Sequence, residues 1–165
     1  NHDKEIILRF ARRGDIVGHL GLGDEIIYPV AATAVGPAMV CFIDMAFFES
    51  TLNVNGAFVK QLMRFFANEL QQADEKVKNL VHMPVKARVA QALLSLDKQF
   101  ATDGSGLLQI ELSRHDLASY SGTVYETLFR SINELTSEGI IQTSGKGIIL
   151  QNNAALMAII ASDNN

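Results

Sequence analysis

The chain of 165 residues contains one cysteine, no tryptophan and three prolines. A single cysteine cannot form a disulfide within the chain, and it cannot build a four-cysteine zinc or iron–sulfur site. No apolar run approaches the roughly 20 residues of a membrane-spanning helix, and the sequence shows no signal-peptide pattern. We therefore expect a cytoplasmic protein with no membrane association, whose 48% of hydrophobic residues suffice to bury a core.

Catalytic constellations are also missing. The four histidines, His2, His19, His82 and His115, are scattered, without an HExxH pattern or an acidic partner at a fixed spacing. No serine or cysteine stands in a nucleophile motif. The lone Cys41 falls in an apolar stretch, residues 38–43, which predicts a strand with a small buried thiol. These absences argue against an enzyme.

The most informative stretch is SRHDLASYSGTVYETLFRSINELTSEGII, residues 113–141. Ser113 with Asp116, and Thr123 with Glu126, each fit a capping pattern in which a side-chain oxygen accepts from the backbone N–H three residues on. Two helix starts about ten residues apart are thus predicted. Glycine fits the sharp turn at position 122 and the helix end at position 139 because it tolerates positive φ. This layout predicts a helix-turn-helix, which places its second helix in the DNA major groove.

The second of these helices, residues 124–137, has two distinct faces at about 100° per residue. Its apolar face consists of Val124, Leu128, Ile132 and Leu135, and its opposite face of Glu126, Phe129, Arg130 and Asn133. A presented Arg can pair bidentately with guanine, and a presented Glu can accept from cytosine N4. We expect this face to read bases. The alternative is an ordinary solvated face on which Glu126 serves only as a cap residue.

Flanking segments predict a wing. Residues 140–143 and 148–151, joined by the turn 144–147, predict a hairpin directly behind the second helix, and residues 107–112 predict a further strand ahead of the first. Phosphate contacts are expected from Lys98, Arg114, Thr123 and Lys146.

Upstream, residues 58–80 contain neither Pro nor Gly and predict one long helix. Its apolar residues recur at steps of three and four and form a continuous stripe, called the seam below: Val59, Leu62, Phe66, Leu70, Ala73, Val77 and Leu80. The seam either packs against its own domain or forms a two-helix dimer interface, and its length favours the dimer. Pro84 then marks a hinge, and residues 85–100 predict another helix.

This order of elements resembles the C-terminal two-thirds of the catabolite activator and fumarate-nitrate regulator family of bacterial transcription factors. The family's recognition helix carries R-E-x-x-x-R, which corresponds here to Tyr125, Glu126 and Arg130. The resemblance implies base contacts from Tyr125, Glu126, Phe129 and Arg130. Tyr125 departs from the usual Arg. Phe129 replaces a small residue, so it can contact a thymine methyl or block the familiar approach.

The same resemblance implies a homodimer that binds a palindromic operator in double-stranded DNA and acts with RNA polymerase. The alternative is a relative that serves as a ligand-sensing or protein-interaction module without specific DNA binding. Effector identity, operator sequence and the direction of regulation do not follow from the residues.

The N-terminal third resembles the family's ligand-sensing β-roll, with residues 6–11 alternating as a strand would. The effector pocket is expected at Gly18, His19, Leu20 and Tyr28. The resemblance places His19 where cyclic-nucleotide-binding members have Glu, and Tyr28-Pro29 where they have the Arg-Ser pair that holds the phosphate. Tyr28 has no charge and Pro29 no N–H, so cyclic AMP is not expected, and neither is haem at His19. The chain starts without Met at a point resembling the middle of the roll, so we expect the earlier strands to be absent from it.

The expected fold class is α+β. It comprises a partial cyclic-nucleotide-binding-like β-roll (1–55), a dimerisation helix (56–82) and a winged helix-turn-helix (83–165). Charge supports DNA binding only weakly, because the net charge is −4 and residues 99–165 hold three Lys or Arg against seven Asp or Glu. Residues 60–98 hold seven against four. We expect modest affinity, strong salt sensitivity and dependence on dimerisation.

Overall fold

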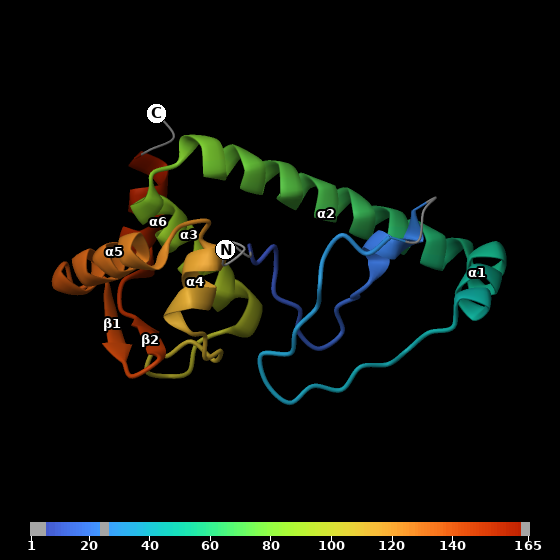
Figure 1. Ribbon diagram of the computed structural model, residues 1–165, viewed down its shortest axis with the longest axis horizontal. Helices are drawn as coiled ribbons and strands as arrows, with labels where there is room; N and C mark the ends of the chain where they lie inside the picture. Colours follow the sequence, from blue (N-terminus) through green and yellow to red (C-terminus); the bar gives the residue numbers. More distant parts are fainter. Residues whose placement is uncertain (1–5, 24–26, 163–165) are drawn as a thin grey trace. The chain divides into compact units, whose positions relative to one another are not determined.

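The computed structural model describes residues 6–23 and 27–162. Its elements are the 3₁₀ helix η1 (His19–Leu22), the helices α1 (Met45–Val54), α2 (Gly56–His82), α3 (Val85–Phe100), α4 (Arg114–Tyr120) and α5 (Tyr125–Ser137), the strands β1 (Ile141–Ser144) and β2 (Gly147–Leu150), and α6 (Asn153–Ser162) (Figure 1). Residues 33–81 form one compact unit, and residues 1–32 with 82–165 form the other. The expected α+β class is confirmed.

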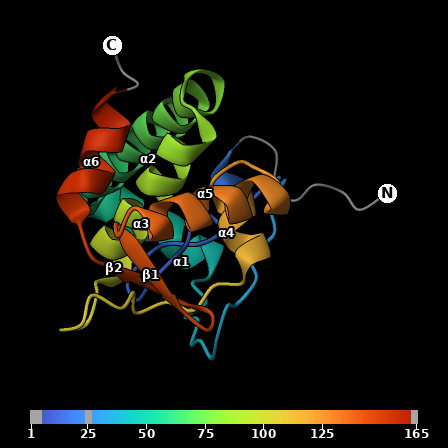
Figure 2. The same cartoon turned by 90° about the vertical axis from the view of Figure 1, so that its left-hand side faces the viewer.

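The unit formed by residues 1–32 and 82–165 has a continuous hydrophobic core. Its most deeply buried side chains come from α3, α4, α5, β1 and α6: Val89, Leu93, Leu96, Leu117, Leu128, Leu135, Ile141 and Leu156. Helix α3 packs against both α5 and α6, and α4 packs against α5 (Figure 2). Phe10 adds an aromatic contact from the N-terminal segment, with its ring centroid 4.9 Å from Tyr120 and 6.3 Å from Phe100. This core holds the helix-turn-helix on a rigid base.

The first predicted helix cap is confirmed. Ser113 Oγ accepts from the Asp116 N–H, and the Asp116 carboxylate accepts in return from the Ser113 N–H, which completes a capping box at α4. Gly122 at φ 65° and Gly139 at φ 70° occupy the left-handed region in the turn and after α5, as predicted.

The second predicted cap is wrong. The N-cap of α5 is Val124, in extended conformation and with no side-chain cap bond, so Thr123 lies one residue too early to cap. The turn itself sets this start: the Thr123 N–H donates to the Ala118 carbonyl at 2.9 Å, which commits Thr123 to closing the α4 end.

The wing hairpin is confirmed, with β1 and β2 pairing antiparallel from Ile141↔Leu150 to Ser144↔Gly147. The strand predicted at 107–112 is wrong, because only isolated bridges form there, Leu107↔Ile149 and Thr102↔Leu108. Successive residues bond to different partners: the Leu108 N–H donates to Ile148 and the Gln109 N–H to Ala101. A segment that divides its hydrogen bonds in this way cannot extend one ladder.

Residues 33–81 contain α1 and α2. The Asp44 carboxylate caps α1 by accepting from the N–H groups of Ala46 and Phe47. Helix α2 covers 27 residues and confirms the long helix predicted for residues 58–80, which it extends by two residues at each end. No residue of 33–81 is buried. None of the helices in the described ranges is long and apolar enough to cross a membrane.

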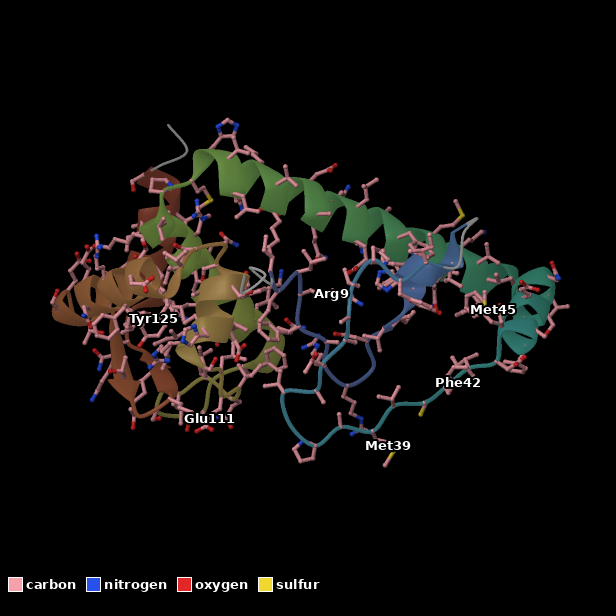
Figure 3. All side chains as sticks on the ribbon, in the orientation of Figure 1. Arg9, Met39, Phe42, Met45, Glu111 and Tyr125 are labelled. Atoms are coloured by element: carbon pink, nitrogen blue, oxygen red, sulfur yellow. The ribbon has the colours of Figure 1, made fainter. Side chains whose placement is uncertain are left out.

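The strands predicted at 6–11 and 38–43 are not formed; neither segment pairs with another strand in the part of the chain that the structure describes. A strand depends on a partner's hydrogen bonds, so its alternating pattern alone does not create one. Met39 and Phe42 are 94% and 93% exposed (Figure 3). Cys41, expected as a buried thiol, is exposed. Residues 1–4, on which the expected missing strands depended, lie outside the described ranges.

Candidate nucleic-acid interface

Helix α5 has one face in the core and one in solvent. Leu128, Ile132 and Leu135 are buried as predicted, while Val124 is 44% exposed and the small Ser131 takes a place in the buried face. The opposite face begins with Glu126 in the first turn and continues through Arg130 and Asn133.

Glu126 and Arg130 are exposed, and neither makes a hydrogen bond or ion pair with any described residue. They lie one turn apart, where opposite charges can pair, yet here both remain available to another molecule. An Arg and a Glu presented together suit a G·C-containing step.

Beside these charges lies an aromatic row formed by His115, Tyr125 and Phe129. Tyr125, labelled at the start of α5 in Figure 3, stacks on His115 with ring centroids 4.6 Å apart and planes at 25°. Phe129 follows at 6.3 Å and 14°. The spacing of Tyr125 and Phe129, one turn apart, is visible in the sequence. The participation of His115 depends on how α4 packs on α5, and sequence reasoning missed it.

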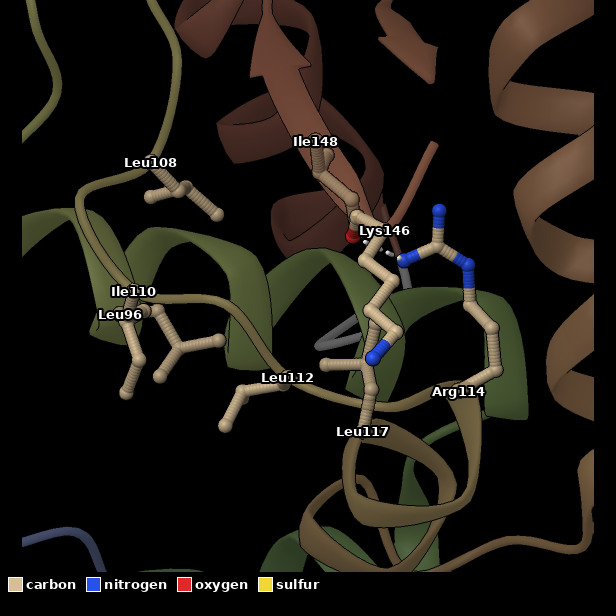
Figure 4. A pocket seen from close by; sticks show the side chains of 8 residues that line it. All are labelled: Leu96, Leu108, Ile110, Leu112, Arg114, Leu117, Lys146 and Ile148. Atoms are coloured by element: carbon tan, nitrogen blue, oxygen red, sulfur yellow. Dashed lines mark hydrogen bonds between the residues drawn. The ribbon is translucent and has the colours of Figure 1, made fainter. Parts of the chain in front are cut away.

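Arg114, a predicted phosphate ligand, holds the wing tip. Its Nη1 donates to the Lys146 carbonyl at 2.9 Å and its Nη2 to the Gly145 carbonyl at 3.4 Å (Figure 4). Burial lowers the pKa of its guanidinium, which stays charged at neutral pH. Arg114 and Lys146 border a depression that has room for about one water and is too small for a ligand. Its other lining residues are apolar: Leu96, Leu108, Ile110, Leu112, Leu117 and Ile148.

The four predicted phosphate ligands are therefore not equivalent. Arg114 and Lys146 are brought together at the wing, and the Lys146 side chain is exposed. Lys98 is exposed in the last turn of α3 and shares no hydrogen bond with them. Thr123 is half-buried in the turn ahead of α5.

Two cationic side chains that sequence reasoning missed fix the helix-turn-helix to the start of α3. Arg88 donates to three carbonyls, those of Met83 at 2.8 Å, Ser121 at 3.1 Å and Gly122 at 3.1 Å. It thereby joins Met83, which precedes α3, to the turn between α4 and α5. Its only sequence signal is a charge within an apolar helix.

Lys86 joins the start of α3 to the end of α5. Its Nζ lies 2.6 Å from Glu138 Oε1 and 3.5 Å from Glu134 Oε2. The hydrogen bond to Glu138 raises the pKa of Lys86. These contacts link the first turn of α3 to the C-terminal end of α5.

Most residues of the expected effector pocket gather around η1. Gly18 precedes η1 in the left-handed region, and His19 is buried with its Nδ1 3.4 Å from Arg9 Nη2. The Tyr28 ring covers Gly21 so closely that a Cβ there would lie 2.6 Å from Tyr28 Cε1. Leu20, by contrast, is exposed. No group of three His, Cys, Asp or Glu in the described residues could hold a metal ion.

The seam of α2 is largely uncovered. Val59, Leu62 and Leu80 are half-buried, whereas four seam residues are exposed: Phe66, Leu70, Ala73 and Val77. Leu70 and Val77 reach 64% and 61% exposure.

Residues 87–159 match the model of the Crp-like helix-turn-helix domain. Two solved structures are similar: FixK2 from Bradyrhizobium japonicum, with 27% identity and a TM-score of 0.66, and a CRP/FNR-family transcriptional regulator from Thermus thermophilus, with 28% and 0.61. The matches cover 71% and 66% of this chain, and 59% and 57% of those chains.

The chain is also 33% identical to the cAMP-activated global transcriptional regulator CRP of Salmonella typhimurium. That match extends over 153 residues, 89% of this chain and 71% of the relative. Family model, curated relative and solved structures agree on the resemblance inferred from the recognition helix, the wing and the long helix. The chain belongs to the CRP/FNR family of transcriptional regulators.

Proposed function

We propose that this chain forms a homodimeric, sequence-specific DNA-binding transcription regulator, in which α5 of each copy reads one half of a palindromic operator. The observation that carries the proposal is the exposed face of α5, where Glu126 and Arg130 have no partner within the described chain while the opposite face is locked in the core. A helix held this rigidly can present charges without first breaking internal contacts.

The base-reading residues are Tyr125, Glu126, Phe129 and Arg130. Phosphate contacts come from Lys98, Arg114, Thr123 and Lys146. Two of the five Arg114 donors bond to the wing, so the rest can meet a phosphate oxygen while the wing tip keeps its position. This arrangement fixes register, and the α5 side chains supply specificity.

The dimer is proposed to form through the seam of α2. A lone chain would leave Leu70 and Val77 in water along a helix of 27 residues. Pairing two copies removes this apolar surface from water at about 25 cal/mol per Å². Accordingly, residues 56–82 serve as the dimerisation helix, 83–165 as the DNA-binding domain and 1–55 as an effector-sensing segment. That segment resembles part of a β-roll in sequence, although no strands pair in its described residues. RNA polymerase is a further partner.

The effector is proposed to be a small molecule other than cyclic AMP. The CRP relative is named as cAMP-activated. Here the Tyr28 ring lies on Gly21 and brings no positive charge to the turn. Native mass spectrometry of full-length protein purified from its own host would identify a bound effector. A stoichiometric adduct with the mass of cyclic AMP would contradict the proposal.

The test of the whole proposal is selection of bound sequences from a pool of random duplexes at low salt. The expected product is an enriched palindrome. Arg130→Ala should then weaken binding by about 1–3 kcal/mol and relax one position of each half-site. Arg64→Ala, which removes an exposed Arg from the polar side of α2, is the matched control and should leave the selected sequence unchanged.

One observation favours a second candidate, a module that senses a ligand or binds proteins without reading DNA. Residues 99–165 carry more acidic than basic side chains, three Lys or Arg against seven Asp or Glu. The same selection decides between the two, because a pool without any enriched sequence supports the module and contradicts the operator.

A further inference from the structure

We propose that Phe129 reads a thymine through its 5-methyl group, that His115 is a positioning residue for this contact, and that Tyr125, in addition to its own base contact, links His115 to Phe129. The proposal rests on the proposed operator binding. It deepens it by assigning one base of the half-site to an aromatic contact.

The geometry places two different rows side by side on α5. Tyr125 and Phe129 are four residues apart and form one row; Glu126 and Arg130 form the next, shifted about 100° around the helix. Both rows begin in the first turn of α5, the end of a recognition helix that contacts base edges. A groove edge that meets the charged row therefore also meets the aromatic row.

Phe129 is a largely exposed apolar side chain that the hydrophobic core does not include. It is 51% exposed, and its described ring partner is Tyr125, itself 37% exposed. Its neighbours on the other side of α5, Leu128 and Ile132, fill the core without it. Transfer of the exposed part of Phe129 onto an apolar group of a partner is favourable.

Among the groups on the major-groove edge, the thymine methyl is the apolar one. Guanine and cytosine edges suit Arg130 and Glu126, whose charges reach hydrogen-bonding atoms. Phe129 offers no hydrogen bond, so a polar edge opposite it would lose water without compensation. The base that satisfies Phe129 is thus the one that carries a methyl.

Stacking of His115, Tyr125 and Phe129 orients the Phe129 ring. Tyr125 is held between His115 at 4.6 Å and Phe129 at 6.3 Å, with all three planes within about 25° of their neighbours. Because His115 belongs to α4, the row is tied to a second helix and not to α5 alone. A ring held in this way loses little freedom when it meets DNA.

The experiment uses the full-length dimer and its selected operator, in which each thymine is replaced in turn by deoxyuridine, which lacks the 5-methyl group. Loss of one buried methyl should weaken wild-type binding about fourfold at one thymine of each half-site. In Phe129→Ala this penalty should vanish. Met157→Ala, which removes an exposed apolar side chain from α6, is the control and should keep it.

The same deoxyuridine penalty tests the positioning role of His115. His115→Ala should reduce the deoxyuridine penalty below that of wild type, whereas His115→Phe, which can keep the stack, should restore it. An unchanged penalty in His115→Ala would remove His115 from this role.

Several outcomes separate the proposals. If an operator is selected but no deoxyuridine substitution weakens binding, the methyl contact is overturned while operator binding stands. A penalty that persists in Phe129→Ala would mean that another residue reads the methyl. If Phe129→Ala alters neither affinity nor sequence preference, the aromatic row serves protein contacts instead. If no operator is selected at all, the proposed function itself fails.

Discussion

The two units of this chain differ in how much of their apolar surface they bury. The helix-turn-helix unit buries leucines and isoleucines from six elements, α3, α4, α5, β1, β2 and α6, in one core, and several of them, including Leu93 and Leu135, are 0% exposed. In residues 33–81 no side chain is buried, although that unit carries the longest apolar stripe of the chain. One unit therefore has a core of its own, whereas the other exposes an apolar stripe, a feature typical of an interaction surface.

In the proposed function, this difference corresponds to two tasks, base reading by one unit and dimerisation by the other. A base-reading helix must keep its side chains within a narrow range of positions, which a closed core provides. A subunit contact must instead leave its apolar face open until a partner arrives.

Leu70→Asp should abolish dimerisation. Each dimer would bury two unpaired carboxylates in the seam, at about 3–5 kcal/mol for each charge. Sedimentation should show a monomer, and operator affinity should fall by at least about 100-fold because one half-site is lost. Gln71→Asp puts the same charge on the polar side of α2 and should remain dimeric. A Leu70→Asp protein that still sediments as a dimer would place the interface elsewhere.

Leu135→Ala should act on the other unit. Truncating this fully buried side chain leaves a cavity and should lower the free energy of unfolding by about 2–5 kcal/mol, measured by urea denaturation. Leu70→Ala is an equal truncation at an exposed position. In protein diluted until it is monomeric, it should lower the free energy of unfolding much less than Leu135→Ala does. Equal losses at the two sites would mean that residues 33–81 contain a core of their own, and the contrast would fail.

Local signals in the sequence predicted most features that depend on neighbours in the chain, although the equally local cap at Thr123 was wrong because that residue closes the end of α4. The capping box at Ser113 and the left-handed glycines 122 and 139 were found because each needs only a few adjacent residues. The long helix and the wing hairpin followed from periodicity.

Long-range features could not be found in this way. The strands predicted at 6–11 and 38–43 failed because a strand is completed by a partner that the alternation of residues does not specify. Arg88 meets carbonyls more than thirty residues away, and His115 stacks across two helices. Both contacts appear only once α3, α4 and α5 have packed, so the supports of the candidate site required the structure.

Residues 99–165 hold three Lys or Arg against seven Asp or Glu, and Tyr125→Arg tests what this shortage of cations costs. It adds a cation to the surface that is proposed to face DNA. If the new charge meets a phosphate, the plot of log affinity against log salt should steepen by about 0.9, and binding should tighten at low salt. Tyr125→Gln is the uncharged control. An unchanged slope would show that this position faces away from the DNA backbone.

The smallest expected effect concerns Lys86, which ties α3 to α5. Its ion pair is partly exposed, so Lys86→Met should cost less than about 1 kcal/mol of unfolding free energy. The pKa of Lys86 is raised by Glu138, so this stabilisation is present below the ordinary lysine value of 10.5 and is lost as pH rises through the folded pKa. The gap between wild type and Lys86→Met should therefore close at high pH, and also in 1 M salt. Lys98→Met is the control, because Lys98 is exposed and has no ion pair with any described residue. It should produce no difference in unfolding free energy that depends on pH or salt. If the difference between wild type and Lys86→Met is independent of both, packing of the aliphatic stem of Lys86 accounts for it.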